Sequence, residues 1–82
     1  MNERQSRIQS IVQSLSHVAG ADPSLQERLF DSGILDSFGL PDLVTALELQ
    51  FRLTIPDSDL LPANFSSIQA IDAYIGRVRK DA

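Results

Sequence analysis

Apolar residues recur at the three- and four-residue spacing of amphipathic helices in three separate segments of this 82-residue chain. The segments cover about residues 3–18, 40–53 and 67–80. Their apolar positions are, in chain order, Ile8, Ile11, Val12, Leu15 and Val18; Leu40, Leu43, Val44, Leu47 and Phe51; and Ile68, Ile71, Ile75 and Val78, with Tyr74 at the edge of the last face. Because nothing reads as a strand, we expect an all-α fold in which these stripes pack on each other.

Residues at the segment ends support the first and third helices. Asn2 with Gln5, and Ser66 with Gln69, have the spacing of a capping box, and Gly20 is a typical stop signal. The last turn of the third helix contains three cations, which favour a helix C-terminus: Arg77, Arg79 and Lys80. The sequence therefore predicts Ser66 as the N-cap of the third helix.

Pro41 limits where the second helix can begin. If Ser37 were the N-cap, Pro41 would be the fourth helical residue, and its missing N–H would remove the first intrahelical hydrogen bond. Proline is favoured instead as the first residue of a helix. We therefore expect a regular helix from about Leu40 or Pro41 to near Leu53, with residues 37–39 in a turn or a distorted first turn.

The first connection is long, and apolar residues are expected to hold it. Asp22 and Pro23 have the order that caps one short helical turn, and residues 31–33 read as a turn. The residues expected to face inward are Leu25, Leu29, Phe30 and Ile34. A connection of this length in a small domain is usually functional.

The second connection is predicted to contain a short helix. Pro56 forces an extended break at Ile55, and a helical piece follows at about residues 59–61, stopped near Pro62. The expected architecture is a small four-helix bundle with three main helices and one short helix. It forms a single domain over residues 1–82, with a long loop between the first two helices.

The composition is that of one small globular domain. Hydrophobic residues make up 43% of the chain and charged residues 22%, and this length allows one modest core. The absence of cysteine excludes disulfides, a thiolate nucleophile and zinc–thiolate sites. Because the chain shows neither a signal peptide nor an apolar run of transmembrane length, we expect a cytoplasmic protein outside the membrane. We also expect it to be a monomer.

The net charge of −4 has an uneven distribution along the chain. Between residues 31 and 59, the single base Arg52 stands against six acids: Asp31, Asp36, Asp42, Glu48, Asp57 and Asp59. Binding to a phosphate backbone needs a basic patch, so nucleic acid is not an expected ligand. A basic protein partner fits this acidic region, and a merely solvated surface is the alternative.

Residues 36–39, Asp-Ser-Phe-Gly, place a serine hydroxyl after an acid and before the second helix, where an anion is favoured. Ser37 lacks the means of catalysis, because the only histidine, His17, is expected on the surface and the glycine-flanked elbow of hydrolases is absent. The acid spacing does not match a calcium loop. We expect no catalytic residue and no metal site, and Ser37 is either modified by another enzyme or only an N-cap.

The order of these motifs resembles that of the acyl carrier protein family, which includes peptidyl and aminoacyl carrier domains. The matching parts are residues 29–38 (Leu-Phe-Asp-Ser-Gly-Ile-Leu-Asp-Ser-Phe), the second helix with Glu48, residues 55–57 (Ile-Pro-Asp) and residues 65–75 (Phe-Ser-Ser-Ile-Gln-Ala-Ile-Asp-Ala-Tyr-Ile). They cover nearly the whole chain in order. The resemblance implies a four-helix bundle in which Ser37, preceded by Asp36, carries 4'-phosphopantetheine.

By the same resemblance, a phosphopantetheinyl transferase installs this arm from coenzyme A, using magnesium. The thiol of the arm then holds an acyl or aminoacyl group as a thioester, which a loading ligase attaches and a downstream synthase or transferase removes. Phe38 and the sparse acids of the second helix, Asp42 and Glu48, differ from the pattern of fatty-acid carriers. This pattern is more similar to that of a dedicated carrier for an amino acid or a specialised metabolite. We expect Phe38, Asp42 and Glu48 to contact partner enzymes.

The sequence is also compatible with two functions other than that of a carrier. A non-catalytic acidic helical adaptor would keep the fold without cargo, and a regulatory module would be phosphorylated at Ser37. Six apolar residues either line a cleft for an acyl chain or belong to the core, which is the expectation: Phe38, Leu43, Leu47, Leu60, Leu61 and Phe65. Phe38 is expected to lie against the bundle and hold the turn.

Overall fold

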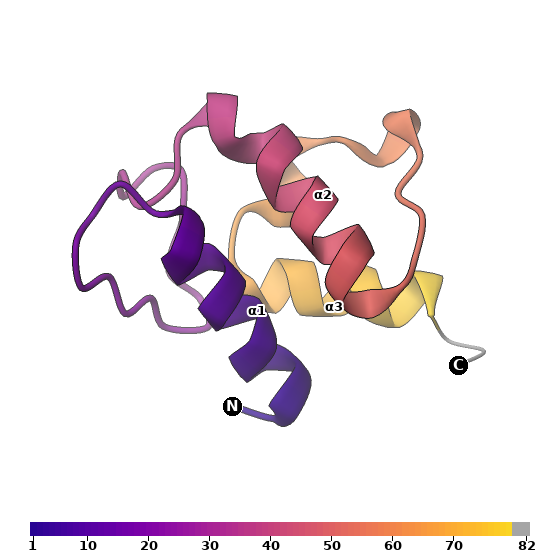
Figure 1. Ribbon diagram of the computed structural model, residues 1–82, viewed down its shortest axis with the longest axis horizontal. Helices are drawn as coiled ribbons and strands as arrows, with labels where there is room; N and C mark the ends of the chain where they lie inside the picture. The colour runs from indigo at the N-terminus through magenta and orange to yellow at the C-terminus, as the bar shows by residue number, and fades with distance from the viewer. Residues whose placement is uncertain (80–82) are drawn as a thin grey trace.

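The computed structural model describes residues 1–79, apart from the side chain of Ser37. Within that range, the α-helices are α1 (Glu3–Leu15), α2 (Leu40–Phe51) and α3 (Ile68–Val78) (Figure 1). Three 3-10 turns lie between them: η1 (Ser37–Gly39), η2 (Asp57–Asp59) and η3 (Pro62–Phe65). Residues 1–79 contain no strand, so the predicted all-α fold is confirmed, whereas the predicted cation Lys80 lies outside the described residues.

The helices pack through the apolar faces that the spacing predicts. α1 contacts both α2 and α3. The buried core consists of Ile8, Ile11, Val12, Leu29, Ile34, Leu35, Leu43, Val44, Leu47, Phe51, Ile55, Phe65, Ile68, Ile71, Tyr74 and Ile75. The face of α3 differs from the prediction at two positions, because Tyr74 is buried and Val78 is 41% exposed.

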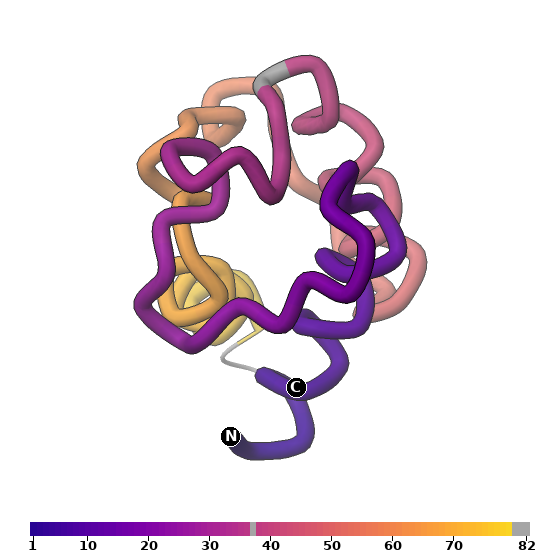
Figure 2. The backbone as a smooth tube through the Cα atoms, turned by 90° about the vertical axis from the view of Figure 1, so that its left-hand side faces the viewer, coloured from indigo at the N-terminus to yellow at the C-terminus, as the bar shows by residue number. Residues whose placement is uncertain are grey.

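The long connection, residues 16–36, contains no helix, although one helical turn is predicted after Asp22 (Figure 2). The Asp22 carboxylate instead accepts a hydrogen bond from the side-chain amide of Gln9 at 3.0 Å. The same amide donates to the carbonyl of Pro23 at 2.9 Å. As predicted, Leu29 and Ile34 are buried, and the partly buried Leu25 and Phe30 pack against the core. The loop therefore has a defined path without a helix of its own.

Two backbone hydrogen bonds tie this loop to the start of α3. The N–H of Leu29 donates to the carbonyl of Ser66 at 2.8 Å, and the N–H of Gln69 donates to the carbonyl of Leu25 at 2.9 Å. The predicted turn at residues 31–33 is confirmed, and Gly33 has a φ of 84°, which favours glycine. The loop thus pairs its backbone groups with a segment far away in sequence.

α3 is capped by Ser67 and not, as predicted, by Ser66. The hydroxyl of Ser67 accepts a hydrogen bond from the N–H of Ala70 at 3.0 Å. The hydroxyl of Ser66 is directed instead to the carbonyl of Ala63, at 3.4 Å. Two consecutive serines have the same capping chemistry. The loop decides between them, because Leu29 holds the carbonyl of Ser66 before the helix begins.

α1 begins as predicted but ends earlier. The capping box between Asn2 and Gln5 is confirmed. The helix stops at Leu15, because Ser16 has an extended backbone with a ψ of 143° and its hydroxyl accepts a hydrogen bond from the N–H of Val18 at 2.9 Å. Local bonds of this kind compete with helix hydrogen bonds. Val18 is 45% exposed and lies outside the predicted apolar face.

The predicted short helix at residues 59–61 is wrong, because two 3-10 turns stand in its place. Between them, Leu60 has a ψ of 57° and leaves helical geometry. The side chain of Asn64 donates to the carbonyl of Asp59 at 2.9 Å, and the hydroxyl of Tyr74 donates to the Asp59 carboxylate at 2.7 Å. Contacts to η3 and α3 therefore fix this segment.

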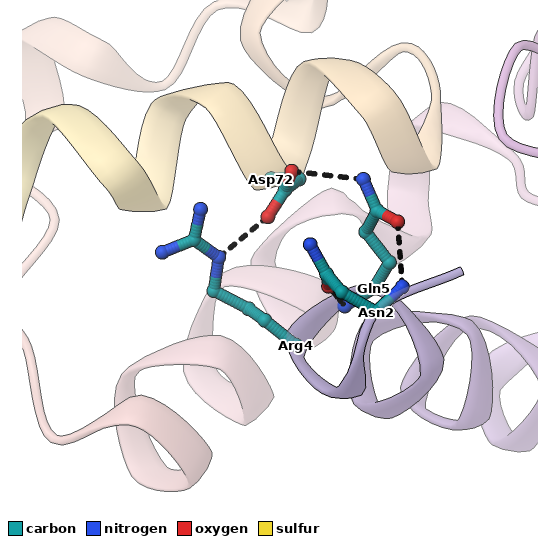
Figure 3. Close-up of polar contacts among 4 residues, drawn as sticks. All are labelled: Asn2, Arg4, Gln5 and Asp72. Atoms are coloured by element: carbon teal, nitrogen blue, oxygen red, sulfur yellow. Dashed lines mark hydrogen bonds and ion pairs between the residues drawn. The ribbon is translucent and has the colours of Figure 1, made fainter.

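A polar network joins the first turn of α1 to α3 (Figure 3). The two oxygens of the Asp72 carboxylate accept hydrogen bonds from Arg4 and from the side chain of Gln5, the latter at 3.0 Å. Gln5 also accepts a hydrogen bond from the N–H of Asn2, so the cap of α1 belongs to the same network. The network therefore ties the first turn of α1 to α3 at a partly buried position.

The first prediction concerns Tyr74. Burial, with the hydrogen bond to Asp59, raises the pKa of Tyr74 from 10.0 to about 12. A raised folded-state pKa stabilises the fold below the unfolded pKa of 10.0, and this contribution is lost as the pH rises toward 12. Tyr74→Phe should lower the free energy of unfolding by about 1–2 kcal/mol at neutral pH. It should also weaken the alkaline loss of stability, as measured by urea unfolding at rising pH, and an unchanged pH dependence would contradict this account.

Candidate functional site

The turn η1 brings residues 36–39 to the N-terminal end of α2. Asp36 precedes the turn, and the side chain of Ser37 lies outside the described residues. The Oδ1 atom of Asp36 accepts the N–H of Gly39 at 2.9 Å, and the Asp36 carbonyl accepts the same N–H at 3.0 Å. Asp36 therefore closes the turn in the manner of a helix cap. The predicted start of α2 at Leu40, next to Pro41, is confirmed.

The second carboxylate oxygen of Asp36 contacts His17, in the long loop just after α1. Nε2 of His17 lies 3.0 Å from Oδ2 of Asp36, and the two side chains are 66% and 50% exposed. The sequence correctly predicts His17 at the surface but not this contact. No periodic pattern could signal it, because the fold of the loop between the two residues brings them together.

The side chain of Phe38 is 89% exposed, so the prediction that it lies against the bundle is wrong. Its apolar neighbours in the chain already fill the inward side, since Leu35 is buried and Leu40 packs partly against the core. Phe38 therefore belongs to the outer face of the turn.

The N-terminus of α2 has properties that suit an anion next to Ser37. Its N-cap, Gly39, makes no side-chain capping hydrogen bond, and the partial positive charge of a helix N-terminus favours a phosphate. The carboxylates of Asp36 and Asp42 oppose this attraction, and Oδ1 of Asp36 is engaged by the Gly39 N–H. A serine in this turn supplies the hydroxyl that a phosphodiester requires, so the residues present fit attachment of 4'-phosphopantetheine.

The two acids predicted on α2 have different surroundings. Asp42 is exposed in the first turn of the helix. Glu48 is half-buried, and its Oε2 accepts a hydrogen bond from the N–H of Ile55 at 2.8 Å. α2 ends at Phe51, and its C-cap, Arg52, has a φ of 53°. The side chain of Glu48 holds the segment that follows. Glu48 therefore has a structural role, whereas Asp42 is open to solvent.

The six apolar residues considered for a cleft do not share one environment. The structure confirms the core assignment for Leu43, Leu47 and Phe65, which are fully buried, while Leu60 packs partly against the core. Phe38 and Leu61 are 89% and 56% exposed, so they line neither the core nor an interior cleft.

Within residues 1–79, His, Asp and Glu side chains form no group of three that could hold a metal ion. No helix in this part of the chain is both long enough and apolar enough to cross a membrane. The candidate site is the turn at Asp36, because this turn is exposed and the Asp36 carboxylate closes it.

Comparisons with known proteins show which family this chain resembles over most of its length. The family described as "Phosphopantetheine attachment site" matches residues 6–75. The chain is 34% identical over 73 residues to aminoacyl carrier protein 2 of Bradyrhizobium diazoefficiens, which covers 87% of this chain and 81% of that protein. It is 34% identical over 55 residues to aminoacyl carrier protein 1 of the same organism, covering 67% and 60%. It is 46% identical over 35 residues to the D-alanyl carrier protein of Streptococcus suis, covering 43% and 44%.

The second prediction tests the structural role of Glu48. Glu48→Ala should lower the free energy of unfolding by about 1–3 kcal/mol, because it leaves the partly buried N–H of Ile55 without its acceptor. Glu48→Gln keeps an oxygen at this position and should cost clearly less. Thermal and urea unfolding of both variants measure the difference, and equal losses would show that the hydrogen bond to Ile55 contributes little.

Proposed function

Because the chain belongs to the family of phosphopantetheine-binding acyl carrier proteins, we propose that Ser37 is the attachment point of its 4'-phosphopantetheine. The covalently attached cofactor supplies a terminal thiol for thioester chemistry, which a chain without cysteine lacks. The single observation that carries the proposal is the exposed turn that Asp36 closes, which lies within the matched residues 6–75. On this reading, residues 1–82 act as one carrier domain without catalytic activity of its own.

In the loading step, the chain provides the acceptor oxygen and a partner enzyme provides the catalysis. The Ser37 oxygen bonds to the phosphorus that bears the pantetheine in coenzyme A. The pyrophosphate bond at that phosphorus breaks, and adenosine 3',5'-bisphosphate leaves. The proton of the serine hydroxyl passes to a base of the phosphopantetheinyl transferase. Asp36 holds the turn through the Gly39 N–H during this transfer.

We propose an aminoacyl group as the cargo, held as a thioester and delivered to partner enzymes. Two relatives are named aminoacyl carrier proteins and one a D-alanyl carrier protein. A small cargo also fits the six apolar residues that could line a cleft for an acyl chain. They lie either in the core or on the surface, so they do not form a cleft that would hold a long chain. A loading ligase would attach the amino acid, and a downstream synthase or transferase would take it.

The proposed partner surface lies around the turn and the first part of α2. Phe38 offers an exposed apolar contact, and Asp42 offers a charge to a basic enzyme surface. The sequence also predicts a partner contact for Glu48, but the hydrogen bond of Glu48 to Ile55 makes Asp42 the more accessible acid. A monomeric state and a cytoplasmic location remain predictions from the sequence.

The third prediction tests the attachment point. After co-expression with a broad-specificity phosphopantetheinyl transferase, the intact mass should rise by one phosphopantetheinyl group, and peptide mapping should place it on Ser37. Ser37→Ala should abolish loading completely and cost at most about 1 kcal/mol of stability. Ser32→Ala, a change of an exposed serine in the preceding loop, should load normally.

Two results would overturn the proposal. An unchanged wild-type mass in the presence of coenzyme A and an active transferase would favour the adaptor without cargo. Loading of Ser37→Ala would place the attachment at another serine, such as Ser58, Ser66 or Ser67.

The fourth prediction tests the acidic partner surface. Asp42→Lys should lower kcat/KM for loading by a basic transferase several-fold, and added salt should reduce the difference from the wild type. The matched control is Glu3→Lys, which makes the same charge change in the first turn of α1. Equal effects of the two reversals would leave the acids around Ser37 with a role in solubility only.

A further inference from the structure

The carboxylate of Asp36 joins two segments of the chain. Oδ1 accepts the N–H of Gly39 at 2.9 Å and closes the turn that contains Ser37 and Phe38. Oδ2 lies 3.0 Å from Nε2 of His17, which comes from the other end of the long loop. The orientation of the carboxylate is therefore set from both sides, by the turn itself and by His17.

The backbone at His17 is held in place from within the same loop. Its N–H donates to the carbonyl of Ile34 at 3.4 Å, and Ile34 and the following Leu35 are buried in the core. On the other side, the hydroxyl of Ser16 accepts the N–H of Val18 and shapes the chain as it leaves α1. The imidazole thus approaches Asp36 from a backbone whose position depends on the core.

We infer that His17 is a positioning residue for the loading of Ser37, acting through the carboxylate of Asp36. This inference rests on the proposed carrier function. The imidazole acts through the contact of its Nε2 with Oδ2 of Asp36. It restricts the rotation of the Asp36 side chain, and so it favours the one arrangement in which Oδ1 closes the turn that a transferase must recognise.

The contact does not require a charged histidine, because a neutral imidazole with its proton on Nε2 donates to a carboxylate as well. Exposed ion pairs contribute little to global stability. The effect of His17 should therefore appear in the turn and in loading, while the unfolding temperature stays nearly constant. A purely structural role would show the opposite pattern.

His17 could also have the opposite effect and slow loading by masking Asp36. If a basic transferase binds Asp36 directly, His17 competes for Oδ2, and its removal speeds loading. The sign of the change in rate therefore separates a histidine that positions Asp36 from one that masks it.

The test compares His17→Ala with the conservative variant His17→Gln, whose amide nitrogen can reach Asp36 as Nε2 does. With coenzyme A and a broad-specificity transferase, His17→Ala should lower kcat/KM for loading about two- to fivefold, the range expected for one exposed pair. His17→Gln should recover most of this loss. Gln26→Ala, a change of an exposed residue in the same loop, serves as the matched control and should load as the wild type does.

A double-mutant cycle identifies the path of the effect. Asp36→Asn keeps an Oδ1 acceptor for Gly39, and in that background His17→Ala should have no further effect on loading. Amide NMR spectra report the turn without any loading. The Phe38 and Gly39 resonances should shift in His17→Ala and return toward their wild-type positions in His17→Gln.

The results that would overturn the role of His17 differ from the result that would overturn the carrier proposal. Loading of His17→Ala at the wild-type rate or faster, or failure of His17→Gln to recover, would overturn the inference. If the wild-type protein is not loaded at all, the carrier proposal fails. In that case, unchanged Phe38 and Gly39 resonances in His17→Ala would also overturn the structural link from His17 to the turn.

Discussion

The structure depends on the burial of the long loop between α1 and α2. Leu29, Ile34 and Leu35 come from this loop, and each is at most 6% exposed in the common core. Full burial of one such side chain contributes about 1.5–3 kcal/mol, which is a large share of the stability of a small domain. Because Asp36 directly follows buried Leu35, the same packing places the turn of Ser37 at the surface, at a defined point relative to the helices.

The backbone of the loop explains which local predictions fail. Its bonds to Ser66 and Gln69 tie it to the approach of α3, and the cap consequently falls on Ser67. Near α1, the Ser16 hydroxyl ends the helix before the apolar pattern ends. The amphipathic stripes and the start of α2 at Pro41 could be predicted, because they depend on periodicity and on the covalent geometry of proline. Pairings between distant segments leave no such signal in one sequence.

At the site, too, the features set by neighbouring residues could be predicted, whereas contacts between distant residues could not. The order Asp36-Ser37 and its place before a helix are visible in the sequence, and so is the resemblance to carrier proteins. The contact of Asp36 with His17 is not visible, since it exists only after the loop has folded. The outward direction of Phe38 is also missed, because apolar character predicts burial unless the neighbouring positions already fill the core.

The two acids of α2 have different roles, and this difference affects how partner enzymes can recognise a carrier of this size. Glu48 uses its carboxylate to hold Ile55, so a charge that reads as part of an acidic surface is in fact bound into the fold. Asp42 and Phe38 remain outside the core and contribute little to it. A small domain can vary such positions at little cost in stability. Partner specificity is therefore expected to reside in a few residues around the turn, where a change in recognition leaves the packing of the three helices intact.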